Sequence, residues 1–207
     1  MAKQFFLDGR PHNGKSYPEY MDMFKNEIDT TNIDKLDESS RELFEYKKLN
    51  FQRSKRIENS YIIAPKLNQV IGMISGRQLW MVLAESWCGD SAQNLPYIAK
   101  IAEVNPNINL RIILRDTNLD IMDEYLTNGS RIIPKLVAFD YDGIELFTWG
   151  PRPKEAQELI LKWKNEGIVK PELYEKLHLW YGKNRGKSIE NEFINILSKV
   201  TTRITSI

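Results

Sequence analysis

The sequence predicts a layered α/β fold with a mixed central sheet, and three observations lead to it. Leu79–Ala84 is a continuous apolar run of strand length, which is typical of a strand buried on both faces. Helical and strand patterns alternate after this run. An Asp-Gly turn at 142–143 joins two more strand patterns into a hairpin. The resulting order, β-α-β-α-β-β-α, is typical of helices that cover a sheet of mixed strand direction.

The chain before this core is predicted to be mainly helical. Residues 1–15 are polar and contain Gly, Pro and Asn, so we expect an extended arm. Tyr17–Ile28 fits a short helix, with Ser16 as its N-cap and a proline in its first turn. Leu36–Ile57 carries apolar residues at helical spacing, and a further short helix around Leu67–Ile74 ends near residue 76.

From residue 79 onward, several predicted elements begin or end at a recognisable cap or turn. The elements after the first strand are helix Ser91–Val104, strand Leu110–Leu114, helix Asn118–Leu126, strands Leu136–Asp140 and Glu145–Trp149, and helix Pro153–Glu166. Asn118 or Thr117 caps the short helix, and glycine ends the last one at Gly167.

Two more helices are expected at the end of the chain, Pro171–Tyr181 and Ser188–Ile204, separated by a basic loop at 182–187. We therefore expect three segments. Residues 1–78 form an arm and helical region packed on the core, residues 79–167 form the core, and residues 168–207 form a helical extension.

The composition indicates a packed globular protein, with 42% hydrophobic and 11% aromatic residues. The net charge of +1 argues against a general electrostatic binder of nucleic acid or of anionic membranes. No run approaches the roughly 20 apolar residues of a membrane span, and the start lacks the pattern of a secretory signal. We expect a soluble cytoplasmic protein that needs no metal and no dissociable cofactor, and homo-oligomers remain an option.

The single cysteine, Cys88, lies where the buried strand passes into a helix. A thiol at a helix N-terminus meets the positive end of the helix dipole and free backbone N–H groups, and both favour the nucleophilic thiolate. The alternative is that Cys88 is an inert, small apolar residue. With one cysteine, the chain forms no internal disulfide.

Residues around Cys88 resemble thioredoxin in order and spacing. Trp87-Cys88-Gly89 matches the family's Trp-Cys-Gly, Pro96 matches the proline of its active-site helix, and Ile133-Pro134 matches the Ile-Pro that carries its cis-proline. Gly150 and Arg131 also match. More closely, the segments 85–93, 115–116, 125–129, 133–135 and 148–153 resemble a bacterial thioredoxin-like family with Trp-Cys-Gly-Asp at its site.

The resemblance implies a thioredoxin fold with Cys88 as the nucleophile and Ile133 and Pro134 as the edge that binds an extended substrate. Two departures restrict the chemistry. Ser91 stands where thioredoxin has its resolving cysteine, and Val82 stands where it has a buried aspartate that assists proton transfer. An enzyme with this site would need an outside thiol to release a mixed disulfide.

The neighbours of Cys88 each have two interpretations. Ser91 either donates a hydrogen bond to the thiolate or serves as a first-turn helix residue, and it is either native or engineered from cysteine. Asp90 raises the pKa of the thiol by like charge, or it is an acid favoured by the helix dipole. Trp87 and Gly89 flank the thiol, and we expect both, with Asp90, to contact the substrate. Trp87 either shields the thiol and offers an apolar contact surface, or it packs in the core.

Arginine and histidine side chains are the remaining candidates for the site. Arg152 could hold a substrate carboxylate, but we expect a solvated arginine in the loop before a helix. His12 and His178 show no pairing with the cysteine, and we expect surface or packing roles.

The function predicted from these residues is monothiol thiol-disulfide exchange or isomerisation, with a protein or a low-molecular-weight thiol or disulfide as partner. The alternative is a non-catalytic binding module with a thioredoxin fold, because the loss of both the resolving cysteine and the buried aspartate favours it equally.

Overall fold

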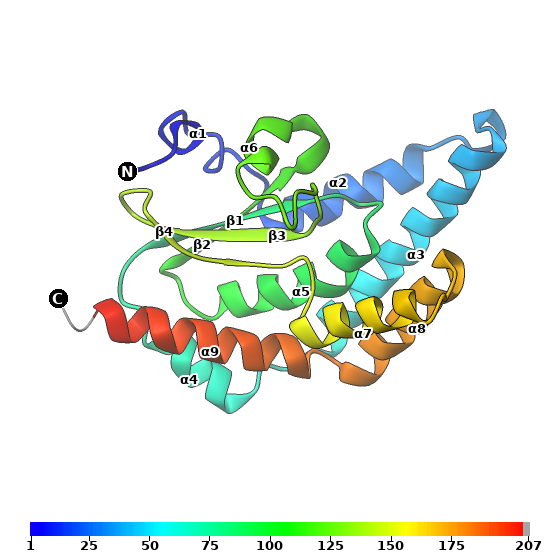
Figure 1. The fold of residues 1–207 in the computed structure, drawn as a ribbon. Helices are drawn as coiled ribbons and strands as arrows, with labels where there is room; N and C mark the ends of the chain where they lie inside the picture. Colours follow the sequence, from blue (N-terminus) through cyan, green and yellow to red (C-terminus); the bar gives the residue numbers. More distant parts are fainter. Residues whose placement is uncertain (205–207) are drawn as a thin grey trace.

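A four-stranded mixed sheet lies at the centre of the computed structural model, which describes residues 1–204 (Figure 1). Its strands are β1 (Gln78–Ala84), β2 (Ile108–Leu114), β3 (Lys135–Asp140) and β4 (Glu145–Trp149), in the spatial order β2-β1-β3-β4. β1 pairs parallel with β2 and antiparallel with β3, and β3 and β4 form an antiparallel hairpin. The predicted mixed α/β fold is confirmed.

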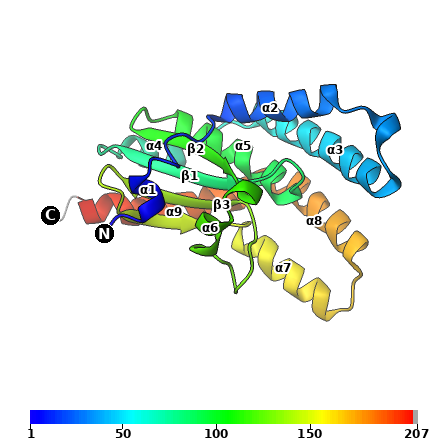
Figure 2. The same ribbon diagram turned by 90° about the horizontal axis from the view of Figure 1, so that it is seen from above.

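The two faces of the sheet carry separate apolar clusters. Alternate residues of β1 point to opposite faces, as the pleat of a strand requires. The even positions, 80–84, join a large core with α5 (Gly89–Glu103) and α9 (Lys187–Ile204), while the odd positions, 79–83, join a smaller cluster that includes Cys88. Figures 1 and 2 show α1 and α6 on the side of the smaller cluster, with α5 and α9 on the other side.

Five helical segments precede β1, and the second begins after Ser16, the N-cap that the sequence predicts. They are α1 (Gln4–Leu7), α2 (Tyr17–Thr30), the 3-10 turn η1 (Ile33–Lys35), α3 (Glu38–Ser60) and α4 (Pro65–Gly72). Ser16 and Glu19 form a reciprocal capping box at the start of α2, which satisfies two otherwise unpaired N–H groups. The long helix α3 packs along α5, the helix that follows Cys88.

The first 15 residues are not simply an extended arm. Residues 4–7 form the short helix α1, and Lys15 makes an antiparallel bridge to Ile112 at the β2 edge. Phe5 and Phe6 are buried, and both rings pack on Phe139 of β3. The prediction was wrong here because two adjacent aromatic side chains bury enough apolar surface to order an otherwise polar segment.

After β2 come the 3-10 turn η2 (Arg115–Thr117) and α6 (Leu119–Asp123), which is shorter than predicted. The chain ends with α7 (Lys154–Asn165), α8 (Lys170–Asn184) and α9. The predicted basic loop at 182–187 is largely helical, because α8 continues to Asn184. Arg185 and Gly186 then turn the chain, both with positive φ, and the Asn184 side chain accepts the Ser188 N–H of α9.

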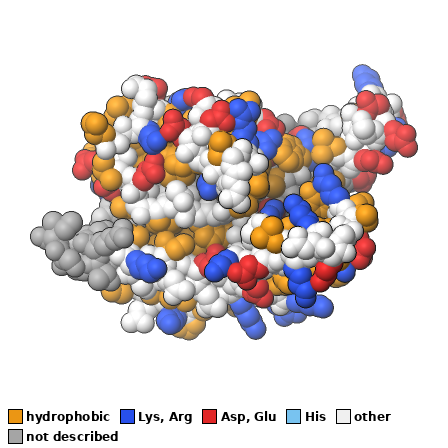
Figure 3. All heavy atoms as spheres, viewed as in Figure 1, with side chains coloured by type: hydrophobic (Ala, Val, Ile, Leu, Met, Phe, Trp, Pro, Cys, Tyr) orange, Lys and Arg blue, Asp and Glu red, His pale blue; other side chains and the backbone are white. Residues whose placement is uncertain are grey.

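Charged side chains of both signs are spread over the face seen in Figure 3, in keeping with the small net charge. Hydrophobic side chains show through a hollow across the middle of this face. No helix in residues 1–204 is both long enough and apolar enough to cross a membrane.

Candidate functional site

Cys88 is the N-cap residue of α5, as the strand-to-helix junction predicts. Its sulfur accepts the Ser91 backbone N–H at 3.4 Å and donates its proton to the Ile133 carbonyl at 3.4 Å. The same sulfur therefore contacts both the helix N-terminus and the loop that carries Pro134. These two segments are 45 residues apart in the sequence.

The Cys88 thiol is buried, with 9% of the residue exposed. The pKa of the thiol is raised to about 11, mainly by burial and secondly by the nearby Asp90 carboxylate, although hydrogen bonds from Ser91 and from the Asp90 backbone act in the opposite direction. The expected preference for the thiolate is therefore reversed in the free protein. Loss of solvation has a larger effect on the pKa of the thiol than the helix dipole has. The sequence alone does not show how completely the thiol is buried.

The Ser91 hydroxyl is buried, and it makes no hydrogen bond of ordinary geometry within the described residues. It nevertheless lies close enough to Cys88 to favour the thiolate. The backbone N–H of Ser91, rather than its side chain, makes the hydrogen bond to the resting sulfur.

The loop opposite the sulfur has the cis Ile133–Pro134 peptide bond that the resemblance implies. Ile133 is buried beside Cys88 in the smaller apolar cluster. Gly150 lies against this loop with a φ of 112°, and a Cβ atom there would collide with the Pro134 carbonyl oxygen. The glycine is thus explained by a close approach of two backbone segments.

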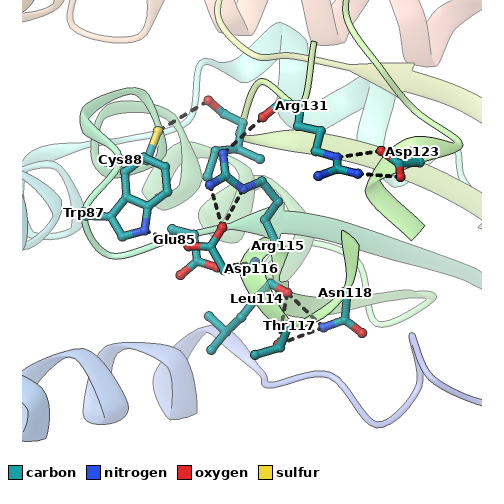
Figure 4. Close-up of polar contacts among 11 residues, drawn as sticks. Glu85, Trp87, Cys88, Leu114, Arg115, Asp116, Thr117, Asn118, Asp123 and Arg131 are labelled. Atoms are coloured by element: carbon teal, nitrogen blue, oxygen red, sulfur yellow. Dashed lines mark hydrogen bonds and ion pairs between the residues drawn. The ribbon is translucent and has the colours of Figure 1, made fainter. Parts of the chain in front are cut away.

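Trp87 is half-buried and lies beside Cys88 (Figure 4). Its indole N–H donates to Asp116 at 3.1 Å, and the Arg115 guanidinium stacks over its ring, 4.7 Å from the centroid. Glu85, just after β1, accepts the Asp116 N–H at 2.7 Å, and burial raises the pKa of its carboxyl. These contacts fix the Trp87 ring beside the thiol.

Asp90 is held in a buried polar network. Its carboxylate accepts Arg152 Nε at 3.1 Å and the Tyr181 hydroxyl at 2.6 Å, and Arg152 also pairs with it through Nη2. Asn94 donates to both the Asp90 carbonyl and the Tyr181 hydroxyl. The expectation of a solvated Arg152 was wrong, because the acid beside the cysteine is buried and requires a partner.

Gly89 is covered by α3 and α8. A Cβ atom there would collide with the Tyr46 hydroxyl and would approach within 3.0 Å of the His178 ring. His178 is hydrogen-bonded through both ring nitrogens, to Tyr46 at 3.0 Å and to Gln93 at 3.2 Å. Burial and the neighbouring Arg53 lower the pKa of His178 to about 4, so its ring is neutral at pH 7.

The structure thus brings together all of the residues predicted for the site, which are Trp87, Cys88, Gly89, Asp90, Ser91, Ile133 and Pro134. Sequence reasoning missed the residues behind the site, which are Tyr46, His178 and Tyr181. They come from α3 and α8, outside residues 79–166, where the motifs that resemble thioredoxin lie, and only their tertiary contacts relate them to the cysteine. Within residues 1–204, no three His, Cys, Asp or Glu side chains form a group that could hold a metal.

Comparison with known families supports this description. The profile of a family described as thioredoxin matches residues 37–166, which is more than half of the chain. The chain belongs to this thioredoxin family. The match starts within the segment expected to precede the core, so the family's domain includes α3.

Two solved structures share the fold over nearly the whole chain. One is a protein of unknown function from Pseudomonas aeruginosa, which is 18% identical, with a TM-score of 0.55, covering 89% of this chain and 98% of its own. The other is an HIV epitope scaffold, also 18% identical, with a TM-score of 0.55, covering 89% of this chain and 99% of its own. No curated protein matches the sequence. At this identity the two structures establish the fold alone.

Proposed function

We propose that the protein carries out monothiol thiol-disulfide exchange through Cys88. The observation that carries this proposal is the contact of the Cys88 sulfur with the Ile133 carbonyl, next to Pro134 and at the N-terminus of α5. A disulfide that reaches the sulfur from the Trp87 side would meet the helix N-terminus and the Pro134 loop together.

The exchange reaction needs only one thiol in the protein, together with one outside thiol. The Cys88 thiolate attacks one sulfur of a substrate disulfide, a Cys88–substrate disulfide forms, and the second substrate sulfur leaves as a thiolate. An outside thiol then attacks the mixed disulfide and restores Cys88. The proposed partners are a protein or a low-molecular-weight thiol or disulfide, in the cytoplasm, and Ser91 stabilises the thiolate without reacting.

The raised pKa sets the rate of this chemistry. With a pKa of about 11, only about one molecule in 10,000 carries the thiolate at pH 7. Exchange should therefore be slow in the free protein and should accelerate about tenfold for each pH unit, up to about pH 11.

The test is the rate of Cys88 alkylation from pH 6 to pH 10.5, with unfolded protein in urea as the reference for an ordinary thiol. Oxidised glutathione is then added, and intact mass spectrometry detects the mixed disulfide and its removal by reduced glutathione. Formation and release of the adduct would support the proposal. If the folded protein formed no adduct at any pH while the unfolded protein did, exchange at Cys88 would be excluded.

A second candidate, a non-catalytic binding module, is favoured by the same high pKa and by the rigid network around Asp90. In that case the segments 1–78 and 168–207 would supply the partner surface. Cys88→Ala distinguishes the two functions. A module keeps its partner after this substitution, whereas a thiol enzyme loses its mixed disulfide.

A further inference from the structure

A cavity of about 660 Å³ lies on the side of α5 that α3 covers, at the turn between α8 and α9. Figure 1 shows α3 passing behind α5 toward this turn. Arg56 and Tyr61 line the cavity from the end of α3, Tyr97 from α5, and Arg185 and Lys187 from the turn. Cys88 does not line it, so a ligand bound in the cavity would not depend on the thiol chemistry.

The cavity has an excess of positive charge. Arg56, Arg185 and Lys187 all line it, and within residues 1–204 none of their charged groups makes an ion pair or a hydrogen bond. The carboxylate on the wall, Glu190, is already held by the Tyr61 hydroxyl at 2.7 Å and by a backbone N–H at 2.9 Å. Both bonds go to Glu190 Oε1, and the three cations against this one carboxylate leave an excess of two positive charges.

The turn that presents these cations has an unusual backbone. Arg185 has a φ of 50°, which is uncommon for a residue with a side chain. Gly186 follows with a φ of 85°, and a Cβ atom there would collide with the Tyr97 ring. The turn is therefore fixed against Tyr97, and it places Arg185 and Lys187 among the residues that line the cavity. A strained residue that the surroundings hold in place is a feature of ligand sites.

The cavity also has aromatic and aliphatic lining residues. The Tyr61 and Tyr97 rings meet edge to face, with centroids 4.6 Å apart, and Ile57 and Ile62 add apolar surface. A volume of this size suits a metabolite rather than a single ion. Arginine and lysine side chains from separate elements suit the several oxygens of a phosphate, and the start of α9 adds the positive end of its dipole.

We propose that this cavity binds a small organic phosphate, with its phosphate groups on Arg56, Arg185 and Lys187 and its apolar or aromatic part against Tyr61 and Tyr97. The probes are ADP, inorganic pyrophosphate and the uncharged nucleoside adenosine. Binding is measured by isothermal titration calorimetry at about 150 mM salt, where attraction to a general surface charge is screened.

Arg185→Gly is the decisive variant, because glycine keeps the positive φ and removes only the side chain. Arg56→Gln tests the same site from α3. Lys183→Ala is the matched control. Lys183 is an exposed cation near the end of α8, two residues before Arg185, and it does not line the cavity. Loss of one cation should weaken ADP binding roughly tenfold, while the control should stay within about twofold.

The expected result is that wild-type protein binds ADP more tightly than pyrophosphate, does not bind adenosine, and loses affinity in both arginine variants. No binding of ADP or pyrophosphate at about 5 mM would overturn the proposal. Equal weakening by Lys183→Ala, or adenosine binding as tight as that of ADP, would also overturn it, because the charges of the cavity would then not be responsible.

Discussion

Protonation of His178 should weaken the folded state, because the ring is held neutral between α3 and α5. Its two nitrogens are hydrogen-bonded to Tyr46 and Gln93, and its pKa is lowered to about 4. Burial is the main cause, and Arg53 and Arg56 lower the pKa further, while Asp90 raises it. An added proton would therefore place an uncompensated charge behind the Cys88 loop.

The size of the effect follows from the two pKa values. The folded state binds the proton more weakly than the unfolded state, whose histidine has a pKa of about 6.5. The stabilisation is thus complete above pH 6.5 and is lost as the pH falls toward 4. Between pH 7 and pH 5 this single group should remove about 2 kcal/mol from the free energy of unfolding.

Urea unfolding of wild type and of His178→Gln at pH 7, 6 and 5 measures this contribution, since the other titrating groups are common to both proteins. Wild type should lose about 2 kcal/mol more than the variant over this range. Proton NMR checks the cause directly, because the chain has two histidines and His12 serves as the internal reference. A His178 midpoint near 6.5, or parallel pH profiles for the two proteins, would refute the reasoning.

Three other substitutions test the packing around the site and the cap of α2, each by its effect on the free energy of unfolding in chemical denaturation. Gly150→Ala should lower the free energy of unfolding by more than 2 kcal/mol, because it adds a collision with the Pro134 carbonyl to the strain of positive φ. Gly129→Ala, also at positive φ but in open space, should lower it by about 1 kcal/mol. Similar losses for the two would argue against the collision. Arg152→Met should lower the free energy of unfolding by about 3 kcal/mol, because it leaves Asp90 charged and buried. Adding Asp90→Asn should recover part of this stability, and no recovery would show that the loss does not come from the unpaired Asp90 charge. Ser16→Ala should cost about 1 kcal/mol through loss of the capping box, and an unchanged midpoint would show that the cap contributes nothing.

Local patterns were sufficient to predict the core of the fold. The apolar run before Cys88 became the central strand, buried along its whole length, because a strand covered on both faces needs no polar residue. Caps and turn residues such as Ser16 and Gly143 marked element boundaries because they act on their immediate neighbours. The first 15 residues were predicted less well, since the burial of Phe5 and Phe6 depends on a strand far along the chain.

The sequence by itself determined which residues form the front of the site, because Cys88, Gly89 and Ser91 are held by the local geometry of one helix N-terminus. The tertiary structure alone decided the state of the thiol. Its pKa depends on how completely α5 and the Pro134 loop exclude water, and the Asp90 charge depends on Arg152 and Tyr181. Solvation and long-range pairing are properties of the packed chain, so no local pattern around Cys88 reveals them.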